Sequence, residues 1–323
     1  MSFLPWMAAA AAAVGIDYVN PIAQPGEPGY NPKPANHFRL VLENDSAFGH
    51  DMNYTHGTRF EYVRDVSEKH AFSASLTQNI YTPEDHTHGN VPGQRPYAGY
   101  LNVGVGHLYK GEYVGNATEF QIGTTGKPSF AEDSQWFIHM LGDMEQWKGW
   151  GDQLDTEVTL QLTTRQDYRL PWLETTTKSG LETDATLYTR EEAGTVSIAG
   201  GVGLSLRIGR NLPASMQVNG NEAANFGVGT LRKAHYRPEE TSWFIVGGVY
   251  VEYVARDMFI DGDAMHRFDQ TCSRKPWQVE GQLGLGVVYR GISYYAGGLV
   301  HSRAYRTQSK NSVMGTFAVS WNW

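Results

Sequence analysis

The stretch from Glu43 to Gly57 holds the densest set of chemically capable side chains in the chain. It brings carboxylate, amide, hydroxyl and imidazole groups together around a short connection between two alternating segments. Strand interiors are usually depleted in Asp, Asn and Gly, so this concentration is unusual for a sheet protein. Oxygen-rich side chains at a hairpin end suit a hard cation such as Ca²⁺. A polar hairpin loop without function would carry the same residue types, and this stretch alone leaves both interpretations open.

A second polar group lies on a helix that we predict over residues 128–142. A proline near the start, acidic residues in the first turn and a glycine at the end indicate its limits. Gln135 and His139 are four residues apart and share one face, beside an apolar stripe with Trp136 and Met140. A solvated face is the ordinary interpretation of the polar stripe, whereas the apolar stripe gives the helix a reason to dock onto a wall or lipid.

Strands must position both groups, because alternation of apolar and polar residues dominates the sequence from Phe38 onward. The pattern predicts about twelve strands, an even number such as single-chain bacterial barrels have. The predicted strands cover residues 38–46, 53–65, 70–81, 98–109, 113–125, 153–168, 181–191, 195–209, 242–257, 277–290, 292–306 and 313–323.

The final predicted strand favours a transmembrane barrel over a soluble sandwich. In a sandwich the apolar strand faces form the core, whereas in an outer-membrane barrel they face lipid and the polar faces line the lumen. Phe317, Val319, Trp321 and Trp323 share one face of this strand, and such an aromatic ending is typical of outer-membrane barrels. The predicted fold class is therefore all-β, an antiparallel barrel with one short loop helix on the outer side. The charged residues predicted to line its lumen are Arg207, Arg256, Arg290, Glu252 and Glu280.

Composition excludes several other classes. A net charge of −8 argues against a nucleic-acid partner, and a mean hydropathy of −0.43 is too polar for a helical membrane protein. The single cysteine, Cys272, gives neither an intramolecular disulfide nor a thiolate metal cluster. Residues 1–23, with an alanine run from Ala8 to Ala13, are similar to a secretory signal peptide, and the proline-rich residues 24–37 are predicted to form a linker to a barrel at 38–323.

Several short motifs occur in one order along the chain. Together they resemble the lipid A 3′-O-deacylase family of Gram-negative outer membranes, densely up to about residue 155 and through the strand pattern afterwards. The motifs are Glu43-Asn44-Asp45, Tyr54-Thr55-x-Gly57, Gln94-Arg95-Pro96-Tyr97-Ala98-Gly99, and Gln135-x-x-x-His139 followed by Gly149-Trp150-x-Asp152-Gln153-Leu154.

The resemblance implies a twelve-stranded barrel in the outer membrane with a Ca²⁺-dependent esterase site between the barrel wall and a loop helix. It implies catalytic roles for Asn44, Asp45, Thr55 and His139, with Asp45 and Glu145 as metal ligands. Arg95 and Gln135 fall at positions expected to bind the substrate, with Arg95 suited to a lipid A phosphate. Ser46 departs from the family, where a further aspartate can stand, so the number of charged metal ligands stays open.

The chemistry of these residue types agrees with ester hydrolysis. A histidine can act as the general base that deprotonates water, and Ca²⁺ can stabilise the developing oxyanion. Strand alternation predicts that Asp45 and Thr55 face the lumen with Arg59, whereas Asn44 faces outward. Either a bulge redirects Asn44 or the site spans both faces of the wall.

Two other classes of barrel remain as alternatives. A phospholipase-type serine hydrolase would also use Ca²⁺ but needs a serine nucleophile, and the chain has no Gly-x-Ser-x-Gly motif. A non-catalytic porin or structural barrel would explain the alternation but not the set of Asn44, Asp45, Thr55 and His139. The expected partners are lipid A or lipopolysaccharide and outer-membrane lipids, and nothing in the sequence requires an oligomer.

Overall fold

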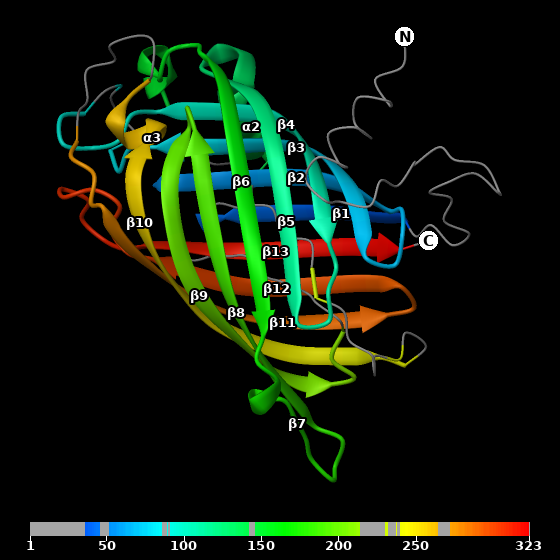
Figure 1. Cartoon of the computed structure of the whole chain (residues 1–323). Coiled ribbons are helices and arrows are strands. Elements are labelled where there is room, and N and C mark those ends of the chain that lie inside the picture. Colours follow the sequence, from blue (N-terminus) through cyan, green and yellow to red (C-terminus); the bar gives the residue numbers. More distant parts are fainter. Residues whose placement is uncertain are drawn as a thin grey trace, which may run out of the picture.

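The computed structural model describes residues 36–45, 52–85, 89, 91–141, 146–213, 230–231, 237, 240–263 and 272–322. Antiparallel strands wrap around a lumen, as Figure 1 shows. The barrel strands are β1 (Asn36–Asn44), β2 (Asn53–Asp65), β3 (His70–Thr82), β4 (Ala98–Tyr109), β5 (Val114–Thr125), β6 (Val158–Arg169), β8 (Glu182–Gly194), β9 (Ser197–Arg210), β10 (Ser242–Asp257), β11 (Trp277–Tyr289), β12 (Ile292–His301) and β13 (Ser312–Asn322).

The sheet closes on itself. Sequential strands pair as antiparallel neighbours, β1 pairs with β13, and β6 pairs with β8 across the connection that holds the short strand β7 (Thr175–Thr176). Because β7 pairs only with β8, the closed wall consists of the twelve other strands of the 13-stranded sheet. The predicted barrel and its strand number are therefore confirmed. β1 begins at Asn36, slightly before the predicted boundary, and the predicted signal peptide lies outside the described residues.

The apolar faces of the strands point outward, as a lipid solvent requires. Val103, Val105 and Leu283 are more than half exposed, whereas the side chains between such residues turn into the lumen and are buried. No helix within the described ranges is both long and apolar enough to cross a membrane.

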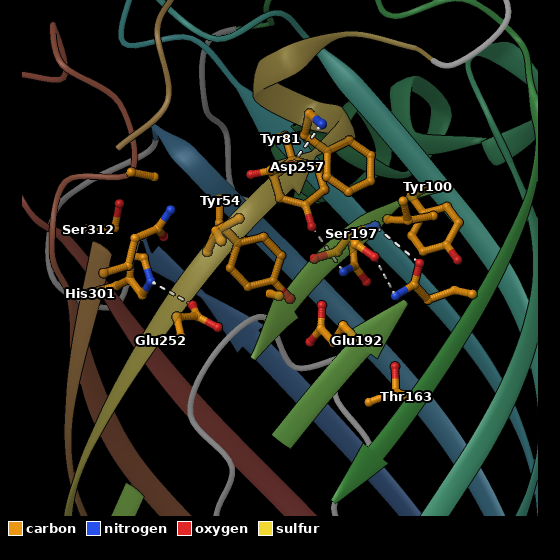
Figure 2. A pocket seen from close by; sticks show the side chains of 18 of the residues that line it. Tyr54, Tyr81, Tyr100, Thr163, Glu192, Ser197, Glu252, Asp257, His301 and Ser312 are labelled. Carbon is orange, nitrogen blue, oxygen red and sulfur yellow. Dashed lines mark hydrogen bonds and ion pairs between the residues drawn. The ribbon is translucent and has the colours of Figure 1, made fainter. Parts of the chain in front are cut away.

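Paired charges cross the lumen. Arg59 is fully buried and contacts Glu119 at 2.5 Å and Glu61 at 2.7 Å, while Arg207 contacts Asp184 at 2.5 Å. Glu252 lies 3.2 Å from Arg190. It also lies 3.8 Å from His301, and Figure 2 shows this pair. A buried charge needs a partner of opposite sign, and these pairs supply one across the barrel.

Two of the arginines predicted to line the lumen lie elsewhere. Arg290 occupies the turn between β11 and β12 with a positive φ of 50°. A register shift between Val254 and Arg256 reverses the alternation at the end of β10, so Arg256 donates to the carbonyls of Thr195 and Gly262. The bulge turns Asp257 into the lumen instead, where it lines a cavity.

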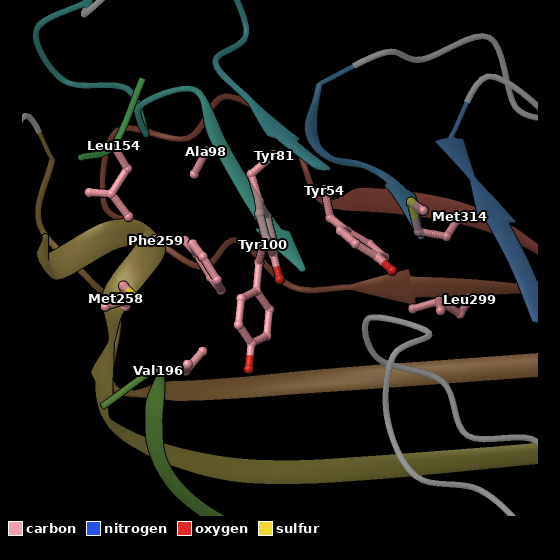
Figure 3. Close-up of a cluster of buried hydrophobic side chains, with 10 residues drawn as sticks. All are labelled: Tyr54, Tyr81, Ala98, Tyr100, Leu154, Val196, Met258, Phe259, Leu299 and Met314. Carbon is pink, nitrogen blue, oxygen red and sulfur yellow. The ribbon is translucent and has the colours of Figure 1, made fainter. Parts of the chain in front are cut away.

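A buried apolar cluster covers one end of the lumen. The short helix α3 (Met258–Asp261) follows β10 and carries Phe259 onto Tyr81, with ring centroids 4.1 Å apart (Figure 3). Asp257 caps this helix by accepting the Phe259 N–H at 2.8 Å. Figure 1 places α3 and the loop helix at the same end of the barrel, and the described C-terminus of β13 lies at the other end. We call these the helix end and the terminal end.

Two described residues of the long connection between β9 and β10 contact lumen-facing side chains at the terminal end. Leu212 packs there with Val41, Phe244 and Tyr295, which face the lumen from three strands. Thr230 donates to Asp167, which also accepts from Arg165 at 2.9 Å. The described residues Leu212 and Thr230 of this connection therefore pack against the lumen side of the wall at the terminal end.

Candidate active site

The loop helix α2 (Ala131–Leu141) packs against the outer face of the barrel wall. Ala131 contacts Ile80 and Tyr97, and Ile80 alternates with the lumen-facing Tyr81 on β3. A 3₁₀ helix at Lys127–Ser129 precedes α2, so the helix predicted over 128–142 is divided at its start. A Cβ on Gly99 would lie 2.0 Å from Ser129 Oγ and 2.4 Å from Ala131 Cβ, so only glycine allows this close approach.

The polar face of α2 points toward the wall. Gln135 and His139 are each 4% exposed, whereas Trp136, Phe137 and Met140 are about half exposed on the opposite side. Exposed apolar side chains on a helix beside a lipid-facing wall indicate contact with the membrane. The polar stripe is thus buried and the apolar stripe faces lipid, which is the reverse of a solvated loop helix.

Two tryptophans fix the buried polar groups of α2. Trp150 Nε1 donates a hydrogen bond of 2.6 Å to Gln135 Oε1. Trp147 meets the His139 ring edge to face, with ring centroids 5.0 Å apart and an interplanar angle of 86°. Trp150 belongs to the 3₁₀ helix Gly149–Asp152, so the connection after α2 folds back over it. Aromatic packing of this kind restricts the orientation of the imidazole.

A β-bulge redirects Thr55 rather than Asn44. The register of β2 against β3 shifts between Tyr54 and His56, which leaves Thr55 as an additional residue. Its Oγ1 lies 2.6 Å from Thr82 Oγ1, and Thr82 shares the outward face of β3 with Ile80. The prediction that Thr55 faces the lumen with Arg59 is therefore wrong, and the bulge is the reason. Asn44 faces outward, as alternation predicts.

Asn44 is held on this outer face by a chain of polar contacts. Its Nδ2 lies 3.4 Å from His56 Nδ1, and His56 Nε2 lies 2.8 Å from Thr58 Oγ1. An amide nitrogen can only donate, so Nδ1 of His56 is the acceptor and the ring carries its proton on Nε2. Asn44, Thr55 and α2 thus belong to the same side of the wall.

Asp45 follows Asn44 directly and is 1% exposed. Its Oδ2 accepts the backbone N–H of Met52 at 2.6 Å, so the carboxylate ties together the connection between β1 and β2. Asn44, Asp45 and Thr55 provide amide, carboxylate and hydroxyl oxygens. Such oxygen donors fit Ca²⁺ better than a softer metal. Within the described ranges, no group of three His, Cys, Asp or Glu residues has metal-binding geometry. Glu145, the second predicted ligand, and Ser46 lie outside those ranges.

Arg95 lies on the other side of the wall. Its guanidinium carbon stands 4.5 Å from the centroid of Tyr81, and the residue lines the cavity of the lumen. Next to it, Tyr305 donates to Asn53 Oδ1 at 2.9 Å, and burial raises the pKa of this phenol, which keeps it neutral. Contact between Arg95 and a lipid A phosphate stays a prediction.

Sequence reasoning missed three supports of the site. Thr82 and His56 hold Thr55 and Asn44, and Trp147 orients His139. His56 lies inside the polar stretch from Glu43 to Gly57, and alternation alone places it on the same face as Asn44. The sequence could therefore have predicted that these two residues lie together. The contact between Thr82 and Thr55 depends on the bulge, and no sequence pattern predicts it.

A closed barrel with apolar strand faces outward and a docked external helix defines an outer-membrane protein. The family described as "Outer membrane protein LpxR" matches residues 4–323. This match spans nearly the whole chain, and the chain belongs to the LpxR family. The resemblance to the lipid A 3′-O-deacylases is thereby confirmed, and so is localisation in the outer membrane of a Gram-negative bacterium.

One solved structure of the same family agrees on the fold. LpxR from Salmonella typhimurium superposes with a TM-score of 0.73 at 16% identity, covering 88% of this chain and 99% of that one. The β domain of the Bordetella autotransporter BrkA gives a TM-score of 0.42 at 10% identity, with 89% and 98% covered. The translocator domain of NalP from Neisseria meningitidis gives 0.36 at 10% identity, with 98% and 94% covered. Comparison with individual curated proteins gives no match.

Proposed function

We propose that this chain is a Ca²⁺-dependent esterase that removes the 3′-O-linked acyloxyacyl chain of lipid A in the outer membrane. The observation that carries this proposal is the docking of α2, which buries His139 against the lipid-facing side of the barrel wall. The polar corner with Asn44 and Thr55 occupies the same side. A site on this face suits a substrate whose acyl chains stay in the bilayer.

In the proposed reaction His139 is the general base. Its imidazole takes a proton from water while the water oxygen attacks the ester carbonyl carbon, and the carbonyl oxygen becomes an oxyanion. When the intermediate collapses, protonated His139 returns the proton to the leaving sugar oxygen, which yields a free hydroxyl and a fatty acid. The packing of Trp147 against the ring holds the base in one orientation through both steps.

Asn44 and Thr55 are the proposed oxyanion donors. One N–H of the Asn44 amide points to His56, and we assign the second N–H to the oxyanion. Donation from Thr82 to Thr55 Oγ1 would direct the Thr55 hydroxyl proton to the substrate. Donors fixed before the reaction need no reorganisation when charge develops, which makes them effective.

Asp45 and Glu145 are the proposed ligands of Ca²⁺. A bound Ca²⁺ would supply positive charge to the substrate carbonyl and to the developing oxyanion. Asp45 is suited to this role because it is buried directly beside Asn44. Gln135 would then shape the substrate groove from α2, where its orientation is fixed by Trp150.

Mass spectrometry of lipid A tests the proposal. Purified, refolded protein is incubated with lipid A in Ca²⁺ and in EGTA, beside a His139→Ala variant. We expect loss of the 3′-linked acyloxyacyl mass only with Ca²⁺ and only with His139 intact. Unchanged lipid A from folded wild-type protein would refute the deacylase and favour a non-catalytic barrel. Release of phospholipid acyl chains instead would favour the phospholipase class.

Calcium binding is measured separately from activity, by isothermal titration. We expect Asp45→Asn to weaken binding at least tenfold. Asp133→Asn is the matched control, because Asp133 is an exposed carboxylate on α2 and has no proposed metal role. Equal affinity in wild type and Asp45→Asn would remove Asp45 from the ligand set.

A further inference from the structure

Arg95 is a buried cation that faces a cavity inside the barrel. Its residue surface is 3% exposed, and it enters the lumen from the connection between β3 and β4 at the helix end. The cavity has a volume of about 100 Å³, enough for a small solute with water. Figure 2 shows the tyrosine rings and polar groups around it, including Tyr54, Tyr81 and Tyr100.

The guanidinium of Arg95 is incompletely satisfied. Its Nε and Nη2 atoms are buried and have no hydrogen-bond partner among the residues that the structure describes. The ring of Tyr81, at 4.5 Å, offers only its π-face, and the neighbouring Tyr305 uses its hydroxyl to donate to Asn53. Two buried guanidinium nitrogens without acceptors carry a large desolvation penalty.

The other buried arginines of the described lumen differ from Arg95. Arg59, Arg165, Arg190 and Arg207 each lie within 3.2 Å of at least one carboxylate oxygen. Within the described residues, Arg95 forms no such ion pair. The cation therefore lacks the compensation that the same barrel gives to its other buried guanidinium groups.

The carboxylates that line the cavity are engaged elsewhere. Glu192 and Glu252 both contact Arg190, at 3.1 Å and 3.2 Å, and His301 approaches Glu252 from the other side. Asp257 caps α3 through the Phe259 N–H. None of these contacts neutralises Arg95, so among the described residues its guanidinium has no carboxylate of the cavity lining as an ion-pair partner.

We propose that Arg95 and the cavity it lines bind a small water-borne oxyanion inside the barrel, of the class of phosphate or a short carboxylate. The planar guanidinium presents Nε and Nη2 side by side, which matches two oxygens of such an anion. The same chemistry is present in a lipid A phosphate, but Arg95 opens to the lumen whereas α2 and the proposed esterase site lie on the outer face. The inference does not depend on the proposed hydrolysis.

Titration with inorganic phosphate tests this site. The full chain is refolded in detergent micelles free of lipid and phosphate, and phosphate is added in a calorimeter. We expect saturable binding to the wild type at one site per chain. Binding should weaken at least tenfold in Arg95→Gln and persist in Arg237→Gln, whose side chain is exposed and pairs with Glu240 at 2.7 Å.

Two further arms keep the result decisive. If Arg95→Gln does not fold, Arg95→Lys retains the charge but loses the two-pronged geometry, and phosphate should again bind more weakly than to wild type. In the second arm bis-phosphorylated lipid A is added to the micelles before the titration. Unchanged phosphate affinity supports the lumen location, whereas competition by lipid A assigns Arg95 to a lipid phosphate and overturns the proposal. Absence of phosphate binding to the wild type overturns it as well.

Discussion

Thr55 gains its place in the site from one additional residue in β2. Without the bulge after Tyr54 its hydroxyl would enter the lumen, and with the bulge it lies 2.6 Å from Thr82 Oγ1 on the outer face. We expect Thr55→Val to lower kcat about 10²–10³-fold, as loss of an oxyanion donor does, with a much smaller change in KM. The rate of lipid A deacylation at several substrate concentrations provides both values.

The matched control for this variant is Thr118→Val. Thr118 Oγ1 lies 3.0 Å from Thr164 Oγ1 in a similar threonine pair on the wall, between β5 and β6. This variant should fold and retain wild-type kcat. If both variants lose activity equally, the lower kcat of Thr55→Val results from a less stable barrel wall and not from the loss of an oxyanion donor.

At the scale of elements, α2 depends on a glycine of the wall. A side chain at Gly99 would meet Ser129 and Ala131, so Gly99→Ala should displace α2 from β3 and β4 while leaving the strand ladder intact. We expect at least a tenfold loss of deacylation, because His139 moves with the helix. Gel mobility of heated and unheated protein checks that the barrel has folded, and mass spectrometry of lipid A measures activity.

Gly281→Ala is the control for this prediction, because a Cβ there would meet no atom within 4 Å. It should leave folding and activity unchanged. Wild-type activity in Gly99→Ala would show that α2 does not need its close approach to the wall.

At the scale of the whole molecule, we expect loss of one partner from a buried ion pair of the lumen to destabilise the barrel. Arg59 is fully buried between Glu61 and Glu119, so Arg59→Gln would leave two carboxylates buried without their main partner. We expect the free energy of unfolding to fall by about 3–5 kcal/mol, measured by urea unfolding in micelles. Arg237→Gln breaks an exposed ion pair and should change stability by less than about 1 kcal/mol. Similar losses in both variants would contradict this account of the lumen.

Most of the barrel could be predicted from the sequence, because a wall between lipid and water forces alternation along each strand. The limits of β2, β4 and β10 agree with the predicted ranges. β6 begins at Val158 rather than at 153, because Gln153 ends a 3₁₀ helix by donating its N–H to Trp150 O. The predicted strand limits differ from the structure where the backbone stops forming hydrogen bonds to the neighbouring strand.

The candidate site was less accessible to sequence reasoning for the same reason. Alternation places Asn44 correctly on the outer face, but it fails at Thr55 and Arg256, where bulges shift the register. Helical spacing groups Gln135 with His139 correctly but does not tell which side of α2 meets the wall. That orientation follows from the close approach at Gly99 and from Trp150, which are tertiary contacts.

The most direct test of the central claim is deacylation of lipid A in ¹⁸O-labelled water. If His139 activates water against the 3′-linked ester, each released acyloxyacyl acid will carry one ¹⁸O atom and the sugar hydroxyl none. His139→Ala, shown to be folded by gel mobility, should release no labelled acid above background. Label in the sugar hydroxyl, or the same labelled release by His139→Ala, would contradict water attack on the acyl carbon by way of His139.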